Sequence, residues 1–327
     1  MDYLHTLTVP TPFAVGPVNL YLVEGEELTL IDTGPIHPDT LDSLQEQLAA
    51  RGIAFKDIRR VIITHAHVDH FGLAAQIVAA SGARVYSHPR NRWWLTDFEN
   101  EWSRRYDFFH DLFVSSGAPV ALADRTIEGM RGFMQYGASI PAKNFFPIAD
   151  SDRVALSGVT WRVINAPGHA SGLIILYEAQ SRTLLSNDHL LLKISSNPVI
   201  EPPLRGEKKR PRMLVDYLAS LDKTARLDAQ IALTGHGEPV RDVRGLIAER
   251  IAFHRARLER IEKEIAAGAA TSFELMGRFF PKIRSVDFFL ALSEVIGHLD
   301  VLEAEGRIYS EQDQIIHYFS APTSVNV

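Results

Sequence analysis

Three histidines and an aspartate lie within one short segment, "VIITHAHVDHFG", at residues 61–72. The segment begins with an apolar run that is typical of a β-strand. Alternate side chains of an extended chain point to the same face, so His65 and His67 can address one point in space. Asp69 and His70 follow in the turn that opens the next helix and can aim at a neighbouring point. This segment is therefore predicted to supply ligands to two metal ions.

Three later segments carry further metal-ligand residue types at the ends of apolar runs. His169 lies in "VINAPGHASG", Asp188 in "LLSNDHLL" and His236 in "IALTGHGEP". Each alone is more often a polar loop residue than a ligand, but four such clusters at strand ends indicate one shared site. Burying them without a metal would leave polar groups unpaired, at a cost of a few kcal/mol for each group.

The composition restricts both the metal and the class of protein. With 327 residues, 46% of them hydrophobic and 23% charged, the chain is predicted to be a folded globular protein. It has no cysteine, so a metal site must use imidazole and carboxylate, which favour zinc and also allow iron or manganese. A net charge of -6 gives no sign of a nucleic-acid or membrane partner, although it does not exclude a local basic groove. No signal-like or membrane-spanning segment is recognised, and a cytoplasmic location is expected.

The pattern of strands and helices predicts two similar β-rich halves. The first half alternates "VNLYLVEG", "LTLIDTG", a helix in "HPDTLDSLQEQLAARGI", "RVIIT", a helix in "FGLAAQIVAASGA" and "RVYSH". The second contains "RVALSG", "TWRVINAPG", "GLIILYEA", "TLLSNDHL", a helix in "PRMLVDYLASLDKTARL" and "AQIALTGHG". Two such halves fit an α/β fold in which two sheets lie between two layers of helices, a four-layered αββα sandwich.

Two regions depart from this pattern. Residues 89–148 are predicted to be a helical insertion rich in aromatic residues, which either pack on the domain or line a substrate pocket. Residues 243–327 are predicted to form three helices and a small hairpin, a winged-helix-like C-terminal segment that follows a catalytic domain of residues 1–242. Its basic and acidic residues are nearly balanced, which favours a packing or oligomerisation role over nucleic-acid binding.

The sequence resembles the metallo-β-lactamase fold superfamily. The signature T-H-x-H-x-D-H corresponds to residues 64–70, later family ligands correspond to His169, Asp188 and His236, and "IDTG" matches a further motif at Asp32. The resemblance covers about residues 10–245. It implies the αββα metallo-β-lactamase sandwich, with metal ions between the two facing sheets.

The resemblance also implies a role for each matching residue. One metal would be held by His65, His67 and His169, and the other by Asp69, His70 and His236, with Asp188 bridging them. Asp32 would orient a ligand by hydrogen bonding, although turn or cap chemistry explains it equally well. His88, His189 and the C-terminal histidines match no motif and are expected to be structural.

These ligands favour hydrolysis. Two divalent ions about 3.5 to 4 Å apart can share a water and bring its pKa toward neutrality, and Asp69 or Asp188 can orient that water or pass on a proton. The strongest resemblance is to glyoxalase-II-like hydrolases, which predicts a small-molecule ester, thioester or lactone as substrate. The absence of a cysteine ligand and the presence of Asp69 count against a typical β-lactamase.

Two alternatives remain open at this point. The C-terminal segment resembles that of endoribonucleases related to lactamase-like protein 2, which cleave phosphodiesters, and a non-catalytic binding module is also conceivable. Substrate contacts are expected from the insertion, with Trp93, Trp94, Phe108 and Phe109 as candidates. The basic loop of residues 193–212 could meet an anionic group or simply be solvated. A homodimer is expected, although packing within the chain explains the same apolar stripes.

Overall fold

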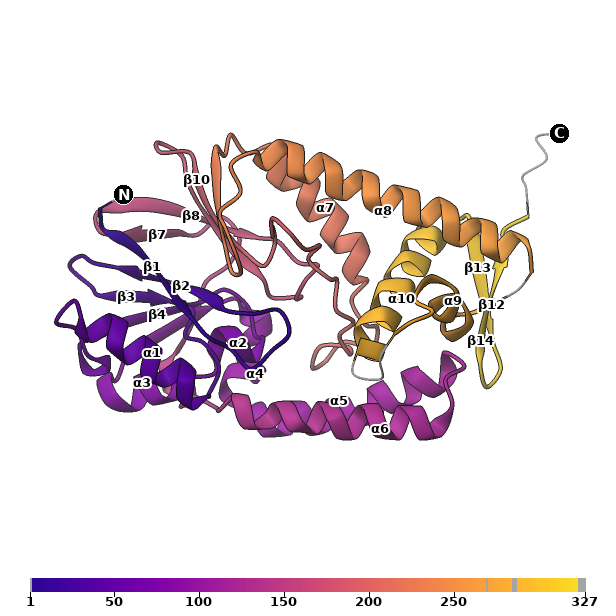
Figure 1. Cartoon of the computed structure of the whole chain (residues 1–327), viewed down its shortest axis with the longest axis horizontal. Helices are drawn as coiled ribbons and strands as arrows, with labels where there is room; N and C mark the ends of the chain where they lie inside the picture. Colours follow the sequence, from indigo (N-terminus) through magenta and orange to yellow (C-terminus); the bar gives the residue numbers. More distant parts are fainter. Residues whose placement is uncertain (1, 269, 284–286, 323–327) are drawn as a thin grey trace.

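Two β-sheets face each other and helices cover their outer faces in the computed structural model, which describes residues 2–268, 270–283 and 287–322 (Figure 1). The first sheet has the strand order β1-β2-β3-β4-β5-β6, antiparallel from β1 to β3 and parallel from β3 to β6. Its strands are β1 (Leu4–Val9), β2 (Val18–Val23), β3 (Thr29–Ile31), β4 (Arg60–Ile63), β5 (Arg84–Ser87) and β6 (Phe145–Pro147).

The second sheet has the order β11-β10-β9-β8-β7. Only the edge pair β10 and β11 is parallel, and the other neighbours are antiparallel. Its strands are β7 (Arg153–Leu156), β8 (Val159–Asn165), β9 (Ile174–Glu178), β10 (Thr183–Asn187) and β11 (Ile231–Thr234). The four-layered sandwich predicted from the sequence is therefore present.

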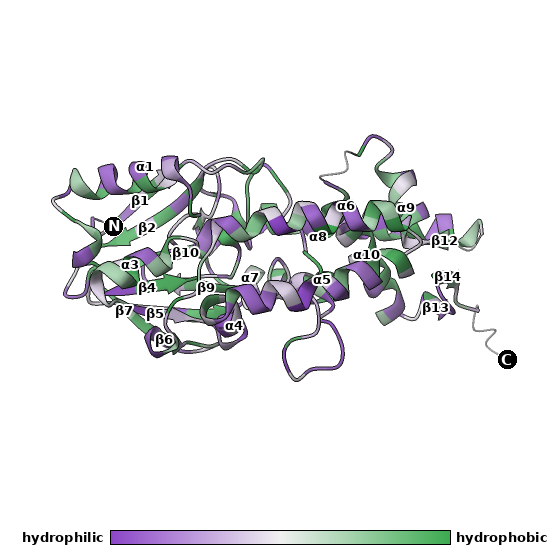
Figure 2. Cartoon of the chain, turned by 90° about the horizontal axis from the view of Figure 1, so that it is seen from below, coloured by the Kyte–Doolittle hydropathy of each residue, from purple (hydrophilic) through white to green (hydrophobic). Residues whose placement is uncertain are grey.

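Strand β2 shows why the layers form. All of its residues, VNLYLV, are buried, as expected for a strand that is covered on both faces. Leu20 and Leu22 point into the apolar cluster under the outer helices, whereas Tyr21 and Val23 point into the cluster between the two sheets. Figure 2 shows the same contrast, with mostly hydrophobic central strands and outer helices that are hydrophilic on part of their surface.

Helices α1 (Pro38–Ala49), α2 (Val68–Phe71) and α3 (Ala74–Ser81) belong to the first half. Leu44 and Leu48 of α1 and Ile77 of α3 contribute to the cluster on the outer face of the first sheet. The single helix expected after the histidine cluster is divided between α2 and α3. Helix α3 ends at Gly82, whose φ of 70° is the left-handed conformation that glycine adopts at low cost.

Most of the expected insertion up to residue 144 is helical, and residues 145–147 form strand β6 at the edge of the first sheet. Its longest helix, α5, lies along the lower edge of the molecule in Figure 1 and reaches the C-terminal segment. The elements are η2 (Pro89–Asn91), α4 (Arg92–Thr96), α5 (Phe98–Ser115), α6 (Val120–Arg131), η3 (Gly132–Tyr136) and η4 (Ala142–Asn144), and a further short turn, η1 (Phe55–Asp57), precedes β4.

The C-terminal segment packs on the second half of the sandwich. One hydrophobic cluster contains Tyr217 of α7, Leu258 of α8, Leu299 of α10 and Phe113 of the insertion. The predicted hairpin is formed by β13 and β14, and β12 pairs with β14. The elements are α7 (Met213–Ala225), α8 (Val243–Ala266), β12 (Ala270–Thr271), α9 (Ser272–Phe279), α10 (Phe288–Ala304), β13 (Ile308–Gln312) and β14 (Ile316–Ser320). Within the described residues, no helix is both long and apolar enough to span a membrane.

Candidate metal centre

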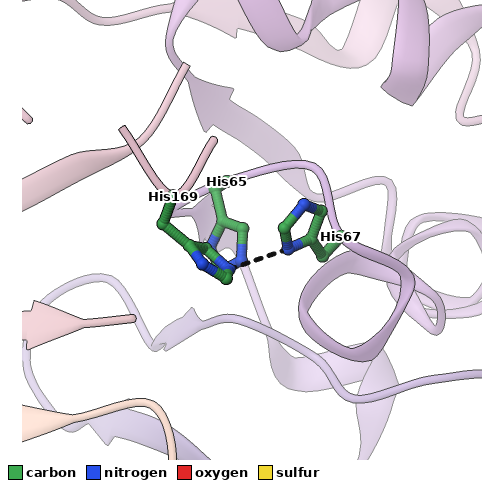
Figure 3. Close-up of side chains that lie close together, drawn as sticks. All are labelled: His65, His67 and His169. Carbon is green, nitrogen blue, oxygen red and sulfur yellow. Dashed lines mark hydrogen bonds between the residues drawn. The ribbon is translucent and has the colours of Figure 1, made fainter. Parts of the chain in front are cut away.

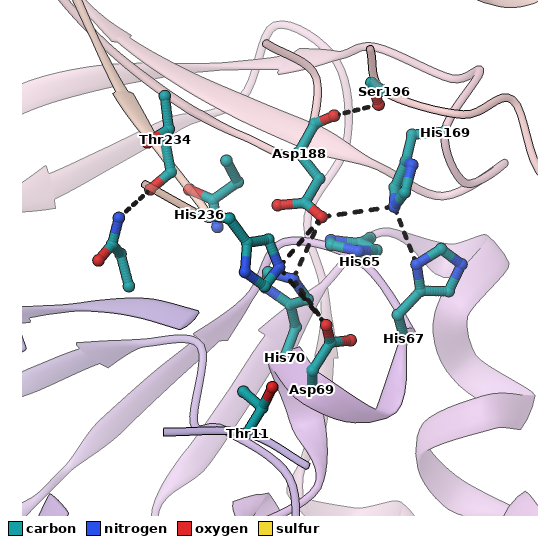
Figure 4. Close-up of polar contacts among 12 residues, drawn as sticks. Thr11, His65, His67, Asp69, His70, His169, Asp188, Ser196, Thr234 and His236 are labelled. Atoms are coloured by element: carbon teal, nitrogen blue, oxygen red, sulfur yellow. Dashed lines mark hydrogen bonds and ion pairs between the residues drawn. The ribbon is translucent and has the colours of Figure 1, made fainter. Parts of the chain in front are cut away.

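The predicted ligands meet where strands of both sheets end (Figure 4). Strand β4 ends directly before the histidine cluster, and β8, β10 and β11 end shortly before the three later ligand segments. Because these strand ends lie at one edge of the sandwich, residues that are far apart in sequence share one place. The structure thus brings together His65, His67, Asp69, His70, His169, Asp188 and His236.

The first group consists of His65, His67 and His169, whose potential ligand atoms all lie within 4.8 Å of one another (Figure 3). The Nδ1 atom of His67 is 2.9 Å from the Nε2 atom of His169. The His65 ring lies 4.7 Å from the His67 ring and 5.1 Å from the His169 ring, centroid to centroid. Three imidazoles that converge in this way are typical of a zinc site with one open position.

The second group consists of Asp69, His70 and His236, which also meet the 4.8 Å limit. The Oδ2 atom of Asp69 is 3.5 Å from the Nε2 atom of His236 and 3.9 Å from that of His70. Asp69 and His70 reach this position from α2, for which His67 is the N-terminal cap residue. The chain changes direction between strand and helix. His65 and His67 therefore lie in the first group, and Asp69 and His70 lie in the second.

Asp188 lies between the two groups. Its Oδ2 atom is 3.5 Å from the Nε2 atoms of both His70 and His169, and 3.6 Å from the Nε2 atom of His236. A carboxylate in contact with histidines of both groups is suited to bridge two cations, because its negative charge offsets their mutual repulsion.

Hydrogen bonds to backbone carbonyls orient two of the predicted ligand imidazoles. The Nδ1 atom of His169 donates to the Asn197 carbonyl at 3.0 Å, and that of His236 donates to the Pro17 carbonyl at 2.8 Å. Since a carbonyl oxygen only accepts, Nδ1 must carry a proton, and Nε2 is the ring nitrogen left to face the centre. This is the usual support for a metal-binding histidine.

Asp32 contacts the predicted ligand His70 but belongs to neither ligand group. Its Oδ2 atom accepts hydrogen bonds from His70 Nδ1 and from the Thr64 hydroxyl, both at 2.8 Å, and from the Asn187 amide. Its Oδ1 atom accepts the backbone N–H of Thr64 at 2.8 Å. Asp32 is fully buried and has a φ of 58°, a conformation that aspartate adopts more readily than most residues. Its geometry therefore suits a carboxylate that orients the His70 ring.

Burial and charge set the protonation of the site. Burial lowers the pKa of His67 to about 3 and that of His65 well below its usual value, so both imidazoles are neutral and able to ligate. Burial also disfavours a charged His70, but the carboxylates of Asp188 and Asp69 outweigh this effect and raise its pKa. Burial raises the pKa of Asp69, but charged His70 and His236 outweigh it and hold that pKa at about 2.

Several buried polar atoms at the centre have no hydrogen-bond partner in the part of the chain that the structure describes. They are the Nε2 atoms of His65, His70 and His236 and the Oδ1 atom of Asp188. Buried polar groups are nearly always satisfied, so a convergent set of unsatisfied ones calls for an explanation. Divalent metal ions fit these residues, because lone pairs of imidazole and carboxylate are the ligands that zinc, iron and manganese accept.

A further group of ligand types outside the predicted centre, His254, Glu294 and His298, lies between α8 and α10. Here hydrogen bonds account for the arrangement: the Nδ1 atom of His298 donates to the Glu294 carbonyl at 2.6 Å, and its Nε2 atom lies 3.2 Å from His254 Nδ1. The Glu294 carboxylate is paired with Arg257 at 2.8 Å. These contacts fit the structural role expected for the C-terminal histidines.

Comparison with known proteins agrees with this geometry. A sequence model of the metallo-beta-lactamase superfamily matches residues 14–236, more than half of the chain. The chain belongs to the metallo-beta-lactamase superfamily. A probable metallo-hydrolase of Bacillus subtilis, YqjP, is 36% identical over 318 residues, which cover 96% of each chain. The family and this relative, together with the ligand groups, make the chain a metal-dependent hydrolase.

Two solved structures of this superfamily match nearly the whole chain. A metallo-beta-lactamase family protein from Thermus thermophilus has a TM-score of 0.81 and 30% identity, with 98% of this chain and 99% of that chain covered. A beta-lactamase domain protein from Burkholderia ambifaria has a TM-score of 0.82 and 25% identity, with 98% and 92% covered. The insertion and the C-terminal segment are thus within the aligned part of this superfamily fold.

The four aromatic residues proposed to line a pocket occupy different environments. Phe109 is 1% exposed and packs in the core with Phe113 and Phe289, and Phe108 is partly buried against the same cluster. Trp94 is partly buried beside Phe98 and Trp102, whereas Trp93 is 40% exposed. Trp93 therefore keeps the surface that a substrate contact requires, and Phe109 does not.

The basic loop of residues 193–212 uses its arginines for ion pairs within this metallohydrolase. Arg205 binds Asp97 at 2.7 Å and Glu101 at 2.9 Å, and Arg210 binds Asp300 through two hydrogen bonds of 2.7 Å. The loop is thereby attached to the insertion and to α10. These two guanidinium groups are already paired, so they are poorly placed to recognise an anionic substrate.

Sequence reasoning missed several residues that support the ligands. Asn187 and Thr64 hold Asp32, and both are neighbours of predicted ligands, so the motif itself could have indicated them. Asn91 donates to the Gly172 carbonyl in the loop that carries His169. Nothing in the local sequence identifies Asn91, because its contact depends on how the insertion begins.

Proposed function

We propose that this metallohydrolase cleaves a small-molecule carboxylic ester, thioester or lactone with a pair of divalent metal ions, most simply zinc. The observation that carries the proposal is the convergence of two three-residue ligand groups on Asp188, together with the unsatisfied buried atoms of His65, His70 and His236. His65, His67 and His169 would hold one ion, and Asp69, His70 and His236 the other. When bound, the ions would supply Lewis-acid chemistry and lower the pKa of a water molecule.

The residues of the chain would supply orientation and charge. Asp188 is suited to set the separation of the two ligand groups, because it contacts histidines of both. Asp69 is the more exposed of the two carboxylates, with 15% of its side chain accessible against 6% for Asp188. Its low pKa keeps it ionised, so it can accept a hydrogen bond from the attacking water and fix its direction.

The ligand chemistry supports this substrate class over a typical β-lactam. The described centre contains only imidazole and carboxylate, and Asp69 lies with His70 and His236 in a group that could hold a metal ion. Both features count against a typical β-lactamase, and the glyoxalase-II-like substrate class itself rests on the sequence resemblance. The buried carboxylate of Asp32 holds the His70 ring, which suits a site that must keep its ligands in place during repeated turnover.

Phosphodiester cleavage is the alternative that the C-terminal segment suggested. An RNA-binding surface would need arginine or lysine side chains that can reach phosphates. Several arginines of this segment are instead paired with carboxylates: Arg307 with Glu259 and Glu262, and Arg257 with Glu294. This pairing favours the structural role of the segment and leaves ester, thioester or lactone hydrolysis as the better supported function.

One experiment separates these functions. The purified protein is analysed for metal and assayed with a panel of thioesters, lactones, carboxylic esters and single-stranded RNA, before and after chelation, with His67→Ala as the control variant. We expect about two metal equivalents, hydrolysis within the small-molecule panel, and loss of activity in both the chelated protein and the variant. Cleavage of RNA alone would support the alternative, and full activity of metal-free protein would refute the metallohydrolase mechanism.

A further inference from the structure

The loop that carries His169 is held from several sides. Ala166 N–H donates to the Leu173 carbonyl at 2.9 Å and closes the loop at its base. The Ser220 hydroxyl donates to the Pro167 carbonyl at 2.7 Å, and Asn91 donates to the Gly172 carbonyl at 2.9 Å. Such a loop has little freedom to move, so the position of the His169 imidazole depends on these supports.

A buried carboxylate makes a further contact with this loop. Glu201 is 6% exposed, and its Oε1 atom accepts the backbone N–H of Ser171 at 2.9 Å. Its Oε2 atom accepts the Ser171 hydroxyl at 2.6 Å. Ser171 is two residues beyond His169, so Glu201 fixes the backbone next to a predicted ligand. Hydrogen bonds to an ionised group are among the stronger ones in proteins.

The charge of Glu201 is balanced by the insertion. Arg105 of α5 is 7% exposed, and its Nη2 atom lies 3.8 Å from Glu201 Oε2. The Arg105 guanidinium also lies over the Trp94 ring, 4.0 Å from its centroid. Burial lowers the pKa of Arg105 to about 10, so the group stays charged at neutral pH. A buried carboxylate with both a cation and two donors is satisfied, which explains why it can exist there.

The segment of residues 196–201 connects these contacts with the centre. The Ser196 hydroxyl donates to the Asp188 carbonyl, and the Asn197 carbonyl accepts the Nδ1 proton of His169. The Asn197 side chain donates to the Leu290 carbonyl of α10 at 3.2 Å. One short stretch of chain therefore contacts two predicted ligands, the insertion and the C-terminal segment.

We propose that Glu201 is a positioning residue for the three-histidine metal site, which it supports through Ser171 while Arg105 holds it in place. The insertion and the C-terminal segment then have a role at the metal centre besides any contact with substrate. The proposal rests on His169 being a metal ligand, as proposed above. Metal titration of the unaltered protein tests that premise separately.

The test compares Glu201→Gln with Glu178→Gln. Glu178 serves as the control, because it too is a buried residue whose carboxylate accepts two hydrogen bonds. Its donors are the backbone N–H groups of Gln180 and Ser181, in a turn that contains none of the predicted ligands. Each variant is stripped of metal and titrated with Zn²⁺ against a competing chelator, and the absorption spectrum of the Co²⁺ form is recorded. Thermal unfolding of each metal-free variant measures the purely structural effect.

We expect Glu201→Gln to weaken one of the metal-binding steps by about 10- to 100-fold and to alter the Co²⁺ spectrum, as loss of a support for a metal ligand usually does. Glu178→Gln should lower the unfolding temperature without either change. Zinc affinity and a Co²⁺ spectrum in Glu201→Gln equal to those of the unaltered protein would overturn the proposal.

A second variant keeps the test decisive if Glu201→Gln does not fold. Ser171→Ala removes only the hydroxyl bond to Glu201 and keeps the backbone bond and the ion pair. We expect a several-fold loss of zinc affinity at the same step. If Ser171→Ala folds and binds both zinc equivalents as tightly as the unaltered protein, Glu201 supports the fold alone and the proposal is wrong.

Discussion

Asp188 is the residue on which the two ligand groups depend together. Replacing it by alanine removes the carboxylate that lies 3.5 to 3.6 Å from histidines of both groups. We predict that Asp188→Ala lowers the occupancy of both metal ions at once, because the bridge and the charge that offsets cation repulsion are lost together. Metal analysis of the purified variant is the measurement. Loss of a single equivalent would show that Asp188 serves one ion only.

Asp32 is predicted to orient a metal ligand without binding metal itself. Asp32→Asn replaces a carboxylate oxygen by an NH₂ group, so the amide can no longer accept from Thr64, His70 and Asn187 together. We predict a 10- to 100-fold loss of affinity for one metal ion, with the other ion less affected. Competition titration with a chelator measures both constants. Unchanged constants would assign Asp32 to turn chemistry alone.

At the scale of elements, the insertion contains a matched pair of aromatic residues. Phe109 is fully packed against Phe113 and Phe289, so Phe109→Ala should lower the free energy of unfolding by about 3–5 kcal/mol and leave relative rates across a substrate panel unchanged. Trp93 is 40% exposed, so Trp93→Ala should have a small effect on stability.

If Trp93 contacts substrate, its alanine variant should raise the Michaelis constant and shift the preference among substrates while both metal ions stay bound. Steady-state kinetics on the same panel, with metal analysis, is the measurement. A variant that keeps the preference of the unaltered protein would show that the pocket wall lies outside this part of the insertion.

Helices α8 and α10 provide a prediction for pH. Burial lowers the pKa of His254 to about 4 and that of His298 to about 3. The unfolded chain therefore binds protons at both residues below about pH 6.5, whereas the folded chain does not. The free energy of unfolding should fall by about 2 kcal/mol for each histidine between neutral pH and pH 5.

The matched variant for this prediction is His254→Gln combined with His298→Gln, because glutamine can hydrogen-bond but does not titrate. Urea unfolding of metal-free protein at several pH values gives the slope of the free energy of unfolding against pH. The double variant should lose stability more slowly on acidification than the unaltered protein. Equal slopes would mean that other groups account for the pH dependence.

Strand and helix assignments were largely accessible from the sequence because each half repeats simple patterns. The apolar runs became β2, β4, β9 and β10, and glycine marked the end of α3. Sequence alone missed β1, and it could not place β6, whose FFP is short and follows helices. Pairing of β6 with β5 depends on the path of the insertion, which local preferences do not determine.

At the metal centre, the positions of residues at strand ends predicted which side chains could meet. They did not predict which other residues hold those side chains in place. The proximity of the predicted ligands follows from strand ends at one edge. Glu201, Asn91 and Asn197 support them through contacts made across the fold. Such contacts join parts of the chain that no short motif connects, so they could be recognised only from the structure.

At the scale of the whole molecule, the C-terminal segment shares its hydrophobic cluster with the sandwich. Leu214, Tyr217 and Leu221 of α7 belong to the same cluster as Leu258 and Leu299 of the segment. A chain ending at residue 242 would expose much of this apolar surface to water. We predict that residues 1–242 alone do not give a soluble, cooperatively folded monomer. Size-exclusion chromatography and thermal unfolding measure this, and a monomer with a sharp transition would establish an independent domain.

The position of the ligands has a consequence for opening of the sandwich. His65 and Asp69 come from the first half, and His169 and His236 come from the second. Several direct hydrogen bonds already join the same edges, among them those of the Tyr21 hydroxyl to the Thr234 carbonyl at 2.6 Å and of the Asn19 amide to the Gly237 carbonyl at 2.9 Å. Bound ions would add further links between the halves, because their predicted ligands come from both. Chelation should then speed amide hydrogen exchange along this edge while the outer helices keep their protection, because the links that the ions supply are lost only at this edge.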